Sequence, residues 1–96
     1  METLSFEWDE NKNEINKRKH GLSFEMAREV FYDSETGLFD DPDHSEDEER
    51  FLIIGMVKSL KICIVSHCYI GSDNVIRIIS AREATKNERK IYQEGW

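Results

Sequence analysis

The sequence predicts an α+β domain in which helices pack on a small antiparallel sheet. Runs at 50–56, 61–69 and 75–80 are rich in β-branched residues and are separated by turn sequences, a pattern typical of an antiparallel meander. The segments on either side begin at capping residues, and the first and last of them end at a glycine, which is typical of helices. Because 96 residues suffice for one hydrophobic core but not for two, we expect a single domain over residues 1–96.

The N-terminal third is predicted to begin with a strand and a helix. Residues 3–8 alternate weakly between polar and apolar side chains and read as a strand. Asp9 suits the N-cap of a helix over 10–20, and Gly21 suits the left-handed residue that follows a helix. This helix is polar nearly all round, so we expect it to lie on the surface, held by few contacts.

A second helix is predicted to begin at Ser23 as its N-cap and to end near residues 32–33. It carries one apolar stripe, spaced to lie on a sheet, made of Phe24, Ala27, Val30 and Phe31. Residues 37–40 then form a short strand, which gives the predicted order β-α-α-β-β-β-β-α together with the three strands above and a C-terminal helix.

Two capping-box sequences compete for the start of the last helix. Ser80 and Thr85 are each followed by a glutamate three residues later. We favour Thr85, because that start leaves Arg82 free on the connecting turn between strand and helix. Gly95 would end this helix.

The net charge of −7 is unevenly distributed along the chain. Nine acidic residues fall within 33–49, where there is no Lys or Arg, while the rest of the chain has 13 basic and 11 acidic side chains. The total charge therefore does not exclude an anionic ligand elsewhere on the protein. The acidic segment reads as a solvated loop, with a dock for a basic partner protein and a weak cation site as alternatives.

The cysteines indicate a reducing environment and no metal site. Cys63 and Cys68 lie in one predicted strand, on opposite faces and about 16 Å apart, too far for a disulfide. The pairings of Cys63 with His67 and of Asp43 with His44 lack zinc-ligand spacing, so we expect no metal or cofactor. No apolar run approaches the ~20 residues that span a bilayer and no signal sequence is apparent, so we expect a cytoplasmic protein and no membrane partner.

Two arginines near the end of the last predicted strand indicate an anion site. Arg77 lies between two large hydrophobes on its face of the strand, and its guanidinium keeps its charge when buried, so it must either meet an anion there or line a cleft. Arg82 follows close to a helix N-terminus, which also favours anions. The alternative for Arg77 is an ion pair with Glu7, Asp9 or Glu88 that organises the junction of sheet and helix.

Two blocks of sequence, supported by residues between and after them, resemble a known family. One block begins at Phe6-Glu7-Trp8-Asp9 and continues to Lys19-His20-Gly21, and the other is Ile76-Arg77-Ile78-Ile79-Ser80-Ala81-Arg82. In these the chain resembles the BrnT family, toxins of bacterial type II toxin–antitoxin modules. The resemblance implies a fold similar to the RelE ribonuclease toxins and a ribonuclease that inhibits translation. It also implies a basic, DNA-binding BrnA-type antitoxin as partner, with DNA contacted only through that complex.

Metal-independent RNA cleavage requires a base for the 2′-hydroxyl, cations for the phosphorane and an acid for the leaving oxygen. The residues of this sequence that suit these roles are Lys19, His20, Arg50, Arg77 and Arg82. We expect Arg77 and Arg82 to hold the scissile phosphate, with Arg50 supporting the charge. Lys19 or His20 would act as base or acid, and histidine is the side chain that ordinarily exchanges protons near neutral pH.

Two other aromatic or titratable residues are expected to be structural. His67 is predicted to be a core histidine and Tyr92 to pack in the core rather than stack on a base.

The alternative function is a non-catalytic module that binds a partner or acts as a co-repressor through an acidic docking surface.

Overall fold

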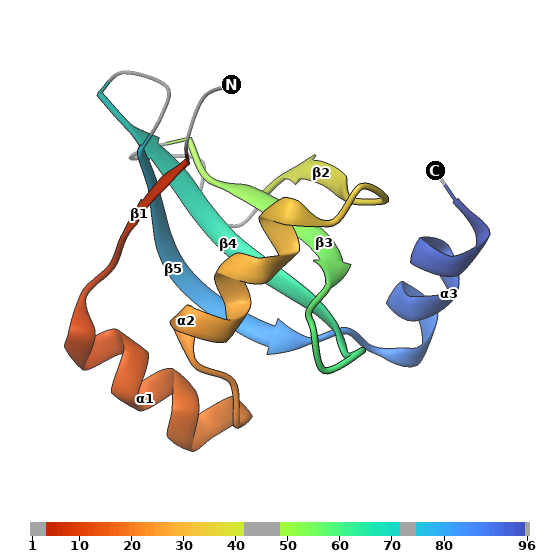
Figure 1. Ribbon diagram of the computed structural model, residues 1–96, viewed down its shortest axis with the longest axis horizontal. Helices are drawn as coiled ribbons and strands as arrows, with labels where there is room; N and C mark the ends of the chain where they lie inside the picture. Colours follow the sequence, from red (N-terminus) through yellow and green to blue (C-terminus); the bar gives the residue numbers. More distant parts are fainter. Residues whose placement is uncertain (1–3, 42–48, 72–74, 96) are drawn as a thin grey trace.

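The computed structural model describes residues 4–41, 49–71 and 75–95 (Figure 1). Its elements follow the predicted order and are β1 (Ser5–Glu7), α1 (Glu10–His20), α2 (Phe24–Ala27), the 3₁₀ helix η1 (Arg28–Tyr32), β2 (Gly37–Asp40), β3 (Phe51–Met56), β4 (Ile62–Ile70), β5 (Val75–Glu83) and α3 (Lys86–Glu94). Residues 42–48 of the acidic segment, including Asp43 and His44, lie outside the described residues. Among the helices of the described part, none is both long and apolar enough to cross a membrane.

The five strands form one sheet in the order β1-β5-β4-β3-β2 (Figure 1). Strands β2, β3, β4 and β5 pair in that order, each antiparallel to the next, which confirms the predicted meander. Strand β1 joins the outer edge of β5 in parallel, with Ser5 opposite Val75, so the sheet is mixed rather than wholly antiparallel. The long connection between β1 and β5 allows this direction, which a short hairpin does not.

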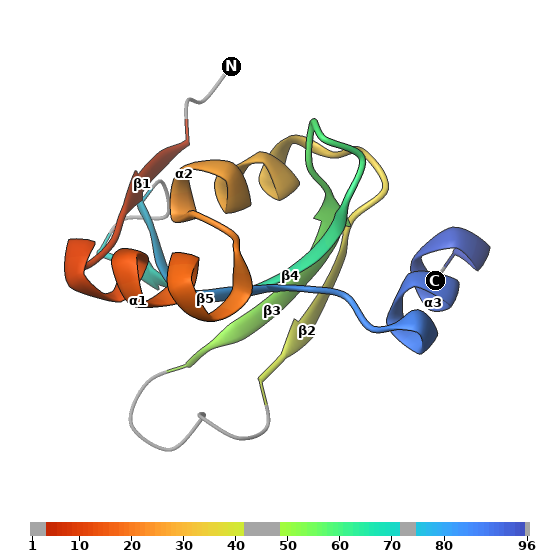
Figure 2. The same ribbon diagram turned by 90° about the horizontal axis from the view of Figure 1, so that it is seen from below.

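One face of the sheet, here called the core face, is covered by α2 and η1 (Figure 2). The predicted apolar stripe of the second helix is confirmed, since three of its side chains are fully buried and Phe31 packs beside them. The buried cluster consists of Leu22, Phe24, Ala27, Val30, Ile53, Val57, Cys63, Val65, Ile78 and Ala81. The core thus combines one helical stripe with alternate residues of the central strands.

His67 and the two cysteines belong to the interior, as predicted. The His67 ring is fully buried and packs edge-on against Phe31, with ring centroids 4.8 Å apart, and burial lowers the pKa of this imidazole. Cys63 and Cys68 are both free and buried. Burial raises the pKa of the Cys63 thiol to about 11, so this thiol stays protonated and unreactive at neutral pH.

The second face of the sheet carries α3 at one end only, where the helix stands beside the strands rather than across them (Figures 1 and 2). Tyr92 packs against the cluster of Ile54, Ile62 and Ile64, and its hydroxyl donates to the carboxylate of Asp33. Partial burial and this carboxylate raise the pKa of Tyr92 to about 12. Tyr92 is therefore a packing residue that tethers α3.

The predicted helix starts are confirmed by the caps, whereas the second predicted helix is an α-helix only to Ala27 and continues to Tyr32 as the 3₁₀ helix η1. The side chains of Asp9, Ser23 and Thr85 each accept hydrogen bonds from the first backbone N–H groups of their helices. Thr85 and Glu88 form a complete capping box, so the later of the two possible starts is correct. Gly21 ends α1 at φ 67°, in the left-handed conformation that glycine adopts without strain.

Helix α1 is attached by two buried asparagines rather than by apolar side chains, since Ile15 is 52% exposed. The Asn16 amide donates to the carbonyl oxygens of Leu22 and Ala81, at 2.8 and 2.9 Å, and its oxygen accepts from the Ala81 N–H at 3.1 Å. Asn16 thus pairs with the edge of β5 beyond the end of β1, as a neighbouring strand would. Asn13 accepts from the Phe24 N–H and joins α1 to α2 in the same way.

We predict that Asn16→Ala lowers the free energy of unfolding by about 3 kcal/mol, because each buried backbone group left without a partner costs roughly 1–3 kcal/mol. Urea unfolding at neutral pH measures this loss. Asn11→Ala is the matched control, because Asn11 is exposed on the same helix. Equal losses in the two variants would show that the Asn16 contacts contribute no specific stability.

Candidate functional site

A β-bulge in β5 places Arg77 and Arg82 on the same face of the sheet. Arg77 lies opposite Cys68 and Arg82 lies opposite Ile64, two residues of β4 that share the second face. Residues five apart in a regular strand point to opposite faces, but the pairing shifts at Ile79, which adds one residue to β5. Both guanidinium groups therefore belong to the second face.

The structure corrects the predicted position of Arg82. We expected Arg82 on the turn after a strand ending at residue 80, whereas β5 continues to Glu83. Strand β4 begins at Ile62 and offers partners to the whole of this extension, as shown by the Ala84 N–H donating to the Ile62 carbonyl. The backbone of Arg82 is thus held in a sheet, which positions its side chain more rigidly than a turn does.

His20 and Arg82 line one hollow of about 80 Å³ on the second face. The two serines Ser66 and Ser80, which face each other across β4 and β5, also line it. His20 is the last residue of α1, and it reaches the hollow because Asn16 fixes that helix to the neighbouring backbone of β5. The complete lining is His20, Leu52, Ile64, Ser66, Ser80, Ala81 and Arg82.

Arg82 makes a two-point ion pair with Glu88 of α3. Its Nη1 and Nη2 donate to the two carboxylate oxygens at 2.8 and 3.0 Å, and the Arg82 side chain remains 41% exposed. The hydrogen bonds from Arg82 are the main cause that lowers the pKa of Glu88 to about 2. They also raise the pKa of Arg82, so both groups keep their charges at any pH at which the protein would act.

Arg77 forms an ion pair with Glu7, one of the three carboxylates that we considered as its structural partners. Its Nε and Nη2 donate to Oε2 of Glu7 at 2.9 and 2.7 Å, across the parallel pairing of β1 and β5. Arg77 lines a separate hollow of about 300 Å³ with Asp9 and Lys12. The structure therefore brings Arg77 to the same face as Arg82 but into a different hollow.

Lys19 and Arg50 lie outside the His20–Arg82 hollow. Lys19 is exposed near the end of α1 and is not one of the residues that line the hollow. Arg50 directly precedes β3, where its carbonyl oxygen accepts from the Asp41 N–H. The buried Asp41 carboxylate is in turn 3.4 Å from the Ser66 hydroxyl, so Arg50 belongs to the surroundings of the hollow.

The residues that sequence reasoning missed are the two serines and the pairing of Glu88 with Arg82. Ser66 and Ser80 come together through strand pairing, for which the sequence carries no local signal.

Within residues 4–41, 49–71 and 75–95, no three His, Cys, Asp or Glu side chains are grouped so that they could hold a metal ion.

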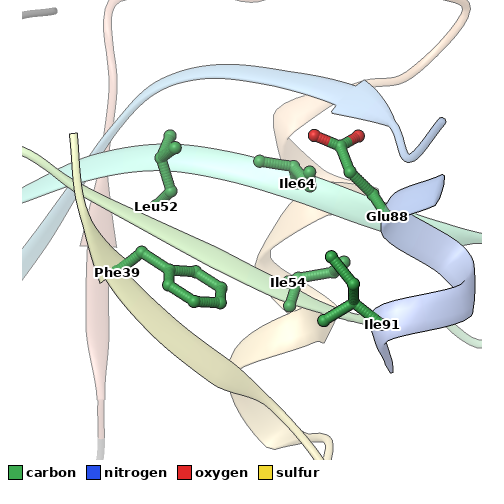
Figure 3. Close-up of a pocket in the computed structure, with 6 residues that line it drawn as sticks. All are labelled: Phe39, Leu52, Ile54, Ile64, Glu88 and Ile91. Atoms are coloured by element: carbon green, nitrogen blue, oxygen red, sulfur yellow. The ribbon is translucent and has the colours of Figure 1, made fainter. Parts of the chain in front are cut away.

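An apolar trough of about 210 Å³ adjoins the His20–Arg82 hollow (Figure 3). It lies between β2 and α3, and the two depressions share Leu52 and Ile64. The trough is lined by Phe39, Leu52, Ile54, Ile64, Glu88 and Ile91. A cationic hollow and an apolar one thus lie side by side on the second face.

The comparisons with known proteins agree with this fold. A family model described as the ribonuclease toxin BrnT of type II toxin–antitoxin systems matches residues 8–88. A 1.1 Å crystal structure of the Brucella abortus ribonuclease toxin BrnT is similar, with 28% sequence identity and a TM-score of 0.66, over 88% of this chain and 100% of that one. No match was found among curated proteins. The family match covers most of the sequence, and the chain belongs to the BrnT family of ribonuclease toxins of type II toxin–antitoxin systems.

Proposed function

We propose that this protein is a metal-independent endoribonuclease that inhibits translation by cleaving RNA in the His20–Arg82 hollow. The observation that carries the proposal is the position of a solvent-accessible histidine beside an arginine held in a strand, on the face of the sheet that α2 and η1 leave uncovered. Family membership supports the reaction class. The site residues and the mechanism are our assignment.

In the proposed reaction the RNA 2′-hydroxyl attacks the adjacent phosphorus, and the bond from phosphorus to the 5′-oxygen of the next nucleotide breaks. The products are a 2′,3′-cyclic phosphate and a free 5′-hydroxyl. Arg82 stabilises the charge that develops on the phosphorane oxygens. Its guanidinium carries five N–H donors, of which Glu88 accepts two, so donors remain for the phosphate.

We assign the other two candidate arginines, Arg50 and Arg77, to substrate binding outside this centre. Arg77 and Arg82 are about 15 Å apart along β5 at the usual rise per residue, and they line separate hollows, so we assign Arg77 to a neighbouring phosphate. Arg50 adds positive charge toward the same end of the sheet as Arg77, since Phe51, the next residue, pairs with His67, the neighbour of the Cys68 that pairs with Arg77. This assignment replaces the expectation that both β5 arginines hold the scissile phosphate.

We assign proton transfer to His20, because it lines the hollow and Lys19 does not. Imidazole is suited to both acid and base roles near neutral pH. Lys19 is exposed on the same helical turn and contributes positive charge near the RNA backbone.

The partner that we propose is a basic, DNA-binding antitoxin of the BrnA type, in the bacterial cytoplasm. Asp40 and Glu49, the two exposed acids on either side of the undescribed segment 42–48, suit a basic protein surface. DNA would be contacted through the antitoxin in the complex. A protein that only binds its partner would use the same acids, and the absence of RNA cleavage would favour that alternative.

We predict that the purified protein without its partner cleaves a defined RNA in excess EDTA and leaves 2′,3′-cyclic phosphate ends. End-group analysis of the fragments measures this. The double variant His20→Gln/Arg82→Ala, purified in the same way, controls for contaminating ribonucleases. Activity that disappears in EDTA and returns with a divalent cation would contradict the metal-independent mechanism.

Arg82→Ala is expected to lower kcat about 100-fold, the effect of removing one group that stabilises a developing oxyanion. Arg77→Ala should instead raise KM and weaken the salt dependence of binding, since it would lose one phosphate contact. Arg28→Ala is the matched control, because it removes the same positive charge from an exposed position on η1, which lies on the core face and away from the site. An equal loss in all three variants would show that only net charge matters.

His20→Gln is expected to lower kcat by roughly 10²- to 10⁴-fold and to remove one limb of the pH–rate profile. Lys19→Gln should leave the shape of that profile unchanged. The reverse result, with the profile altered only in Lys19→Gln, would assign proton transfer to the lysine. Thermal unfolding of both variants checks that each remains folded.

A further inference from the structure

We infer that the apolar trough beside Arg82 is a binding subsite for one nucleobase of the RNA, next to the phosphate that is cleaved. The inference rests on the proposed ribonuclease function and adds to it the part of the protein that reads the substrate.

The trough has the size and lining that a planar base requires. Apolar cavities of about 150 Å³ hold a benzene-sized ring, and this trough measures about 210 Å³. Figure 3 shows Phe39 of β2 and Ile91 of α3 on opposite sides of the trough, with Ile54 of β3 at its floor. Phe39 is 46% exposed and Ile91 is 49% exposed, so a flat ligand can reach both walls from solvent.

The position of the trough relative to Arg82 fits one nucleotide. Leu52 and Ile64 line both the trough and the His20–Arg82 hollow, so the two depressions are adjacent. Arg82 lies opposite Ile64, which lies opposite Ile54, and two strand spacings place their backbones about 10 Å apart. A phosphate on the Arg82 guanidinium therefore has its own ribose and base within reach of the trough.

The chemistry of the lining favours a base over a phosphate. Among the described residues, Glu88 is the one charged group that lines the trough, so the lining offers no cation to a phosphate, whereas a carboxylate oxygen accepts hydrogen bonds from base amino groups. Single-stranded RNA is commonly bound by stacking of bases on aromatic side chains. Among the exposed large aromatic side chains of the described part, Tyr32 lies on η1 and Tyr69 on the core face, whereas Phe39 lies on the second face with Arg82.

The test compares Phe39→Ala with Leu38→Ala. Leu38 is the neighbouring residue of β2, is 55% exposed and faces the opposite side of the sheet, so its substitution removes a similar apolar surface away from the trough. An RNA that the wild-type protein cleaves is made resistant by a 2′-O-methyl group at the scissile nucleotide. Oligonucleotides that each lack one base at successive positions are then compared by Kd.

The expected result is one position at which loss of the base weakens binding to the wild-type protein and to Leu38→Ala by about tenfold or more. Phe39→Ala should bind the complete RNA about tenfold more weakly and should lose this dependence at that position. Phe39→Trp should restore both properties, which separates stacking from an effect on folding.

Three results would overturn the inference, and they have different consequences for the proposed ribonuclease function. If the wild-type protein cleaves RNA but Phe39→Ala responds to every missing base as the wild type does, the ribonuclease proposal stands and the subsite is wrong. If Phe39→Ala loses only inhibition by the antitoxin, the trough is a protein-docking surface. If the wild-type protein cleaves no RNA, with or without ribosomes, the proposed function fails and the subsite fails with it.

Discussion

The arrangement of the candidate site depends on the hydrogen bonds between Asn16 and the backbone of Ala81. Strand β1 covers only the first part of the outer edge of β5, and the side-chain amide of Asn16 satisfies the N–H and C=O groups of Ala81 farther along that edge. A buried backbone group without a partner would cost roughly 1–3 kcal/mol, so this contact is specific as well as stabilising. The same contact fixes the position of the C-terminal end of α1 relative to β5. His20 lies one helical turn beyond Asn16 and is consequently held over the strand that carries Arg82.

The bulge at Ile79 allows β5 to place apolar side chains on the core face and both arginines on the second face. Before the bulge Ile78 points into the core, and after it Ala81 does, so β5 packs against the helices along its length. The same shift keeps Arg77 and Arg82 together on the second face. Without the extra residue, one arginine would have to enter the apolar core, where an unpaired charge is very costly. The bulge thus lets one strand contribute both to the core and to a cationic surface.

Helix α3 is connected to the candidate site through one carboxylate with two roles. Glu88 completes the capping box of α3 by accepting from the Thr85 N–H at 2.8 Å, and it orients the guanidinium of Arg82. The pair is partly exposed, and exposed ion pairs contribute typically 0–1 kcal/mol, so it positions Arg82 more than it stabilises the fold. A phosphate that draws Arg82 away from Glu88 would therefore meet little resistance. The Tyr92–Asp33 hydrogen bond would still hold the helix in place.

The sequence by itself determined the order of the elements, the helix caps and the set of cationic candidates. Caps such as Asp9 and Thr85 act on backbone groups two or three residues away, so local sequence suffices to predict them. The tertiary structure alone decided which candidates meet. Asn16 and Ala81 are 65 residues apart, and the parallel pairing of β1 also joins distant segments. A bulge changes the face of every residue that follows it without leaving a local pattern. For that reason only the folded chain shows that His20 and Arg82 share one hollow.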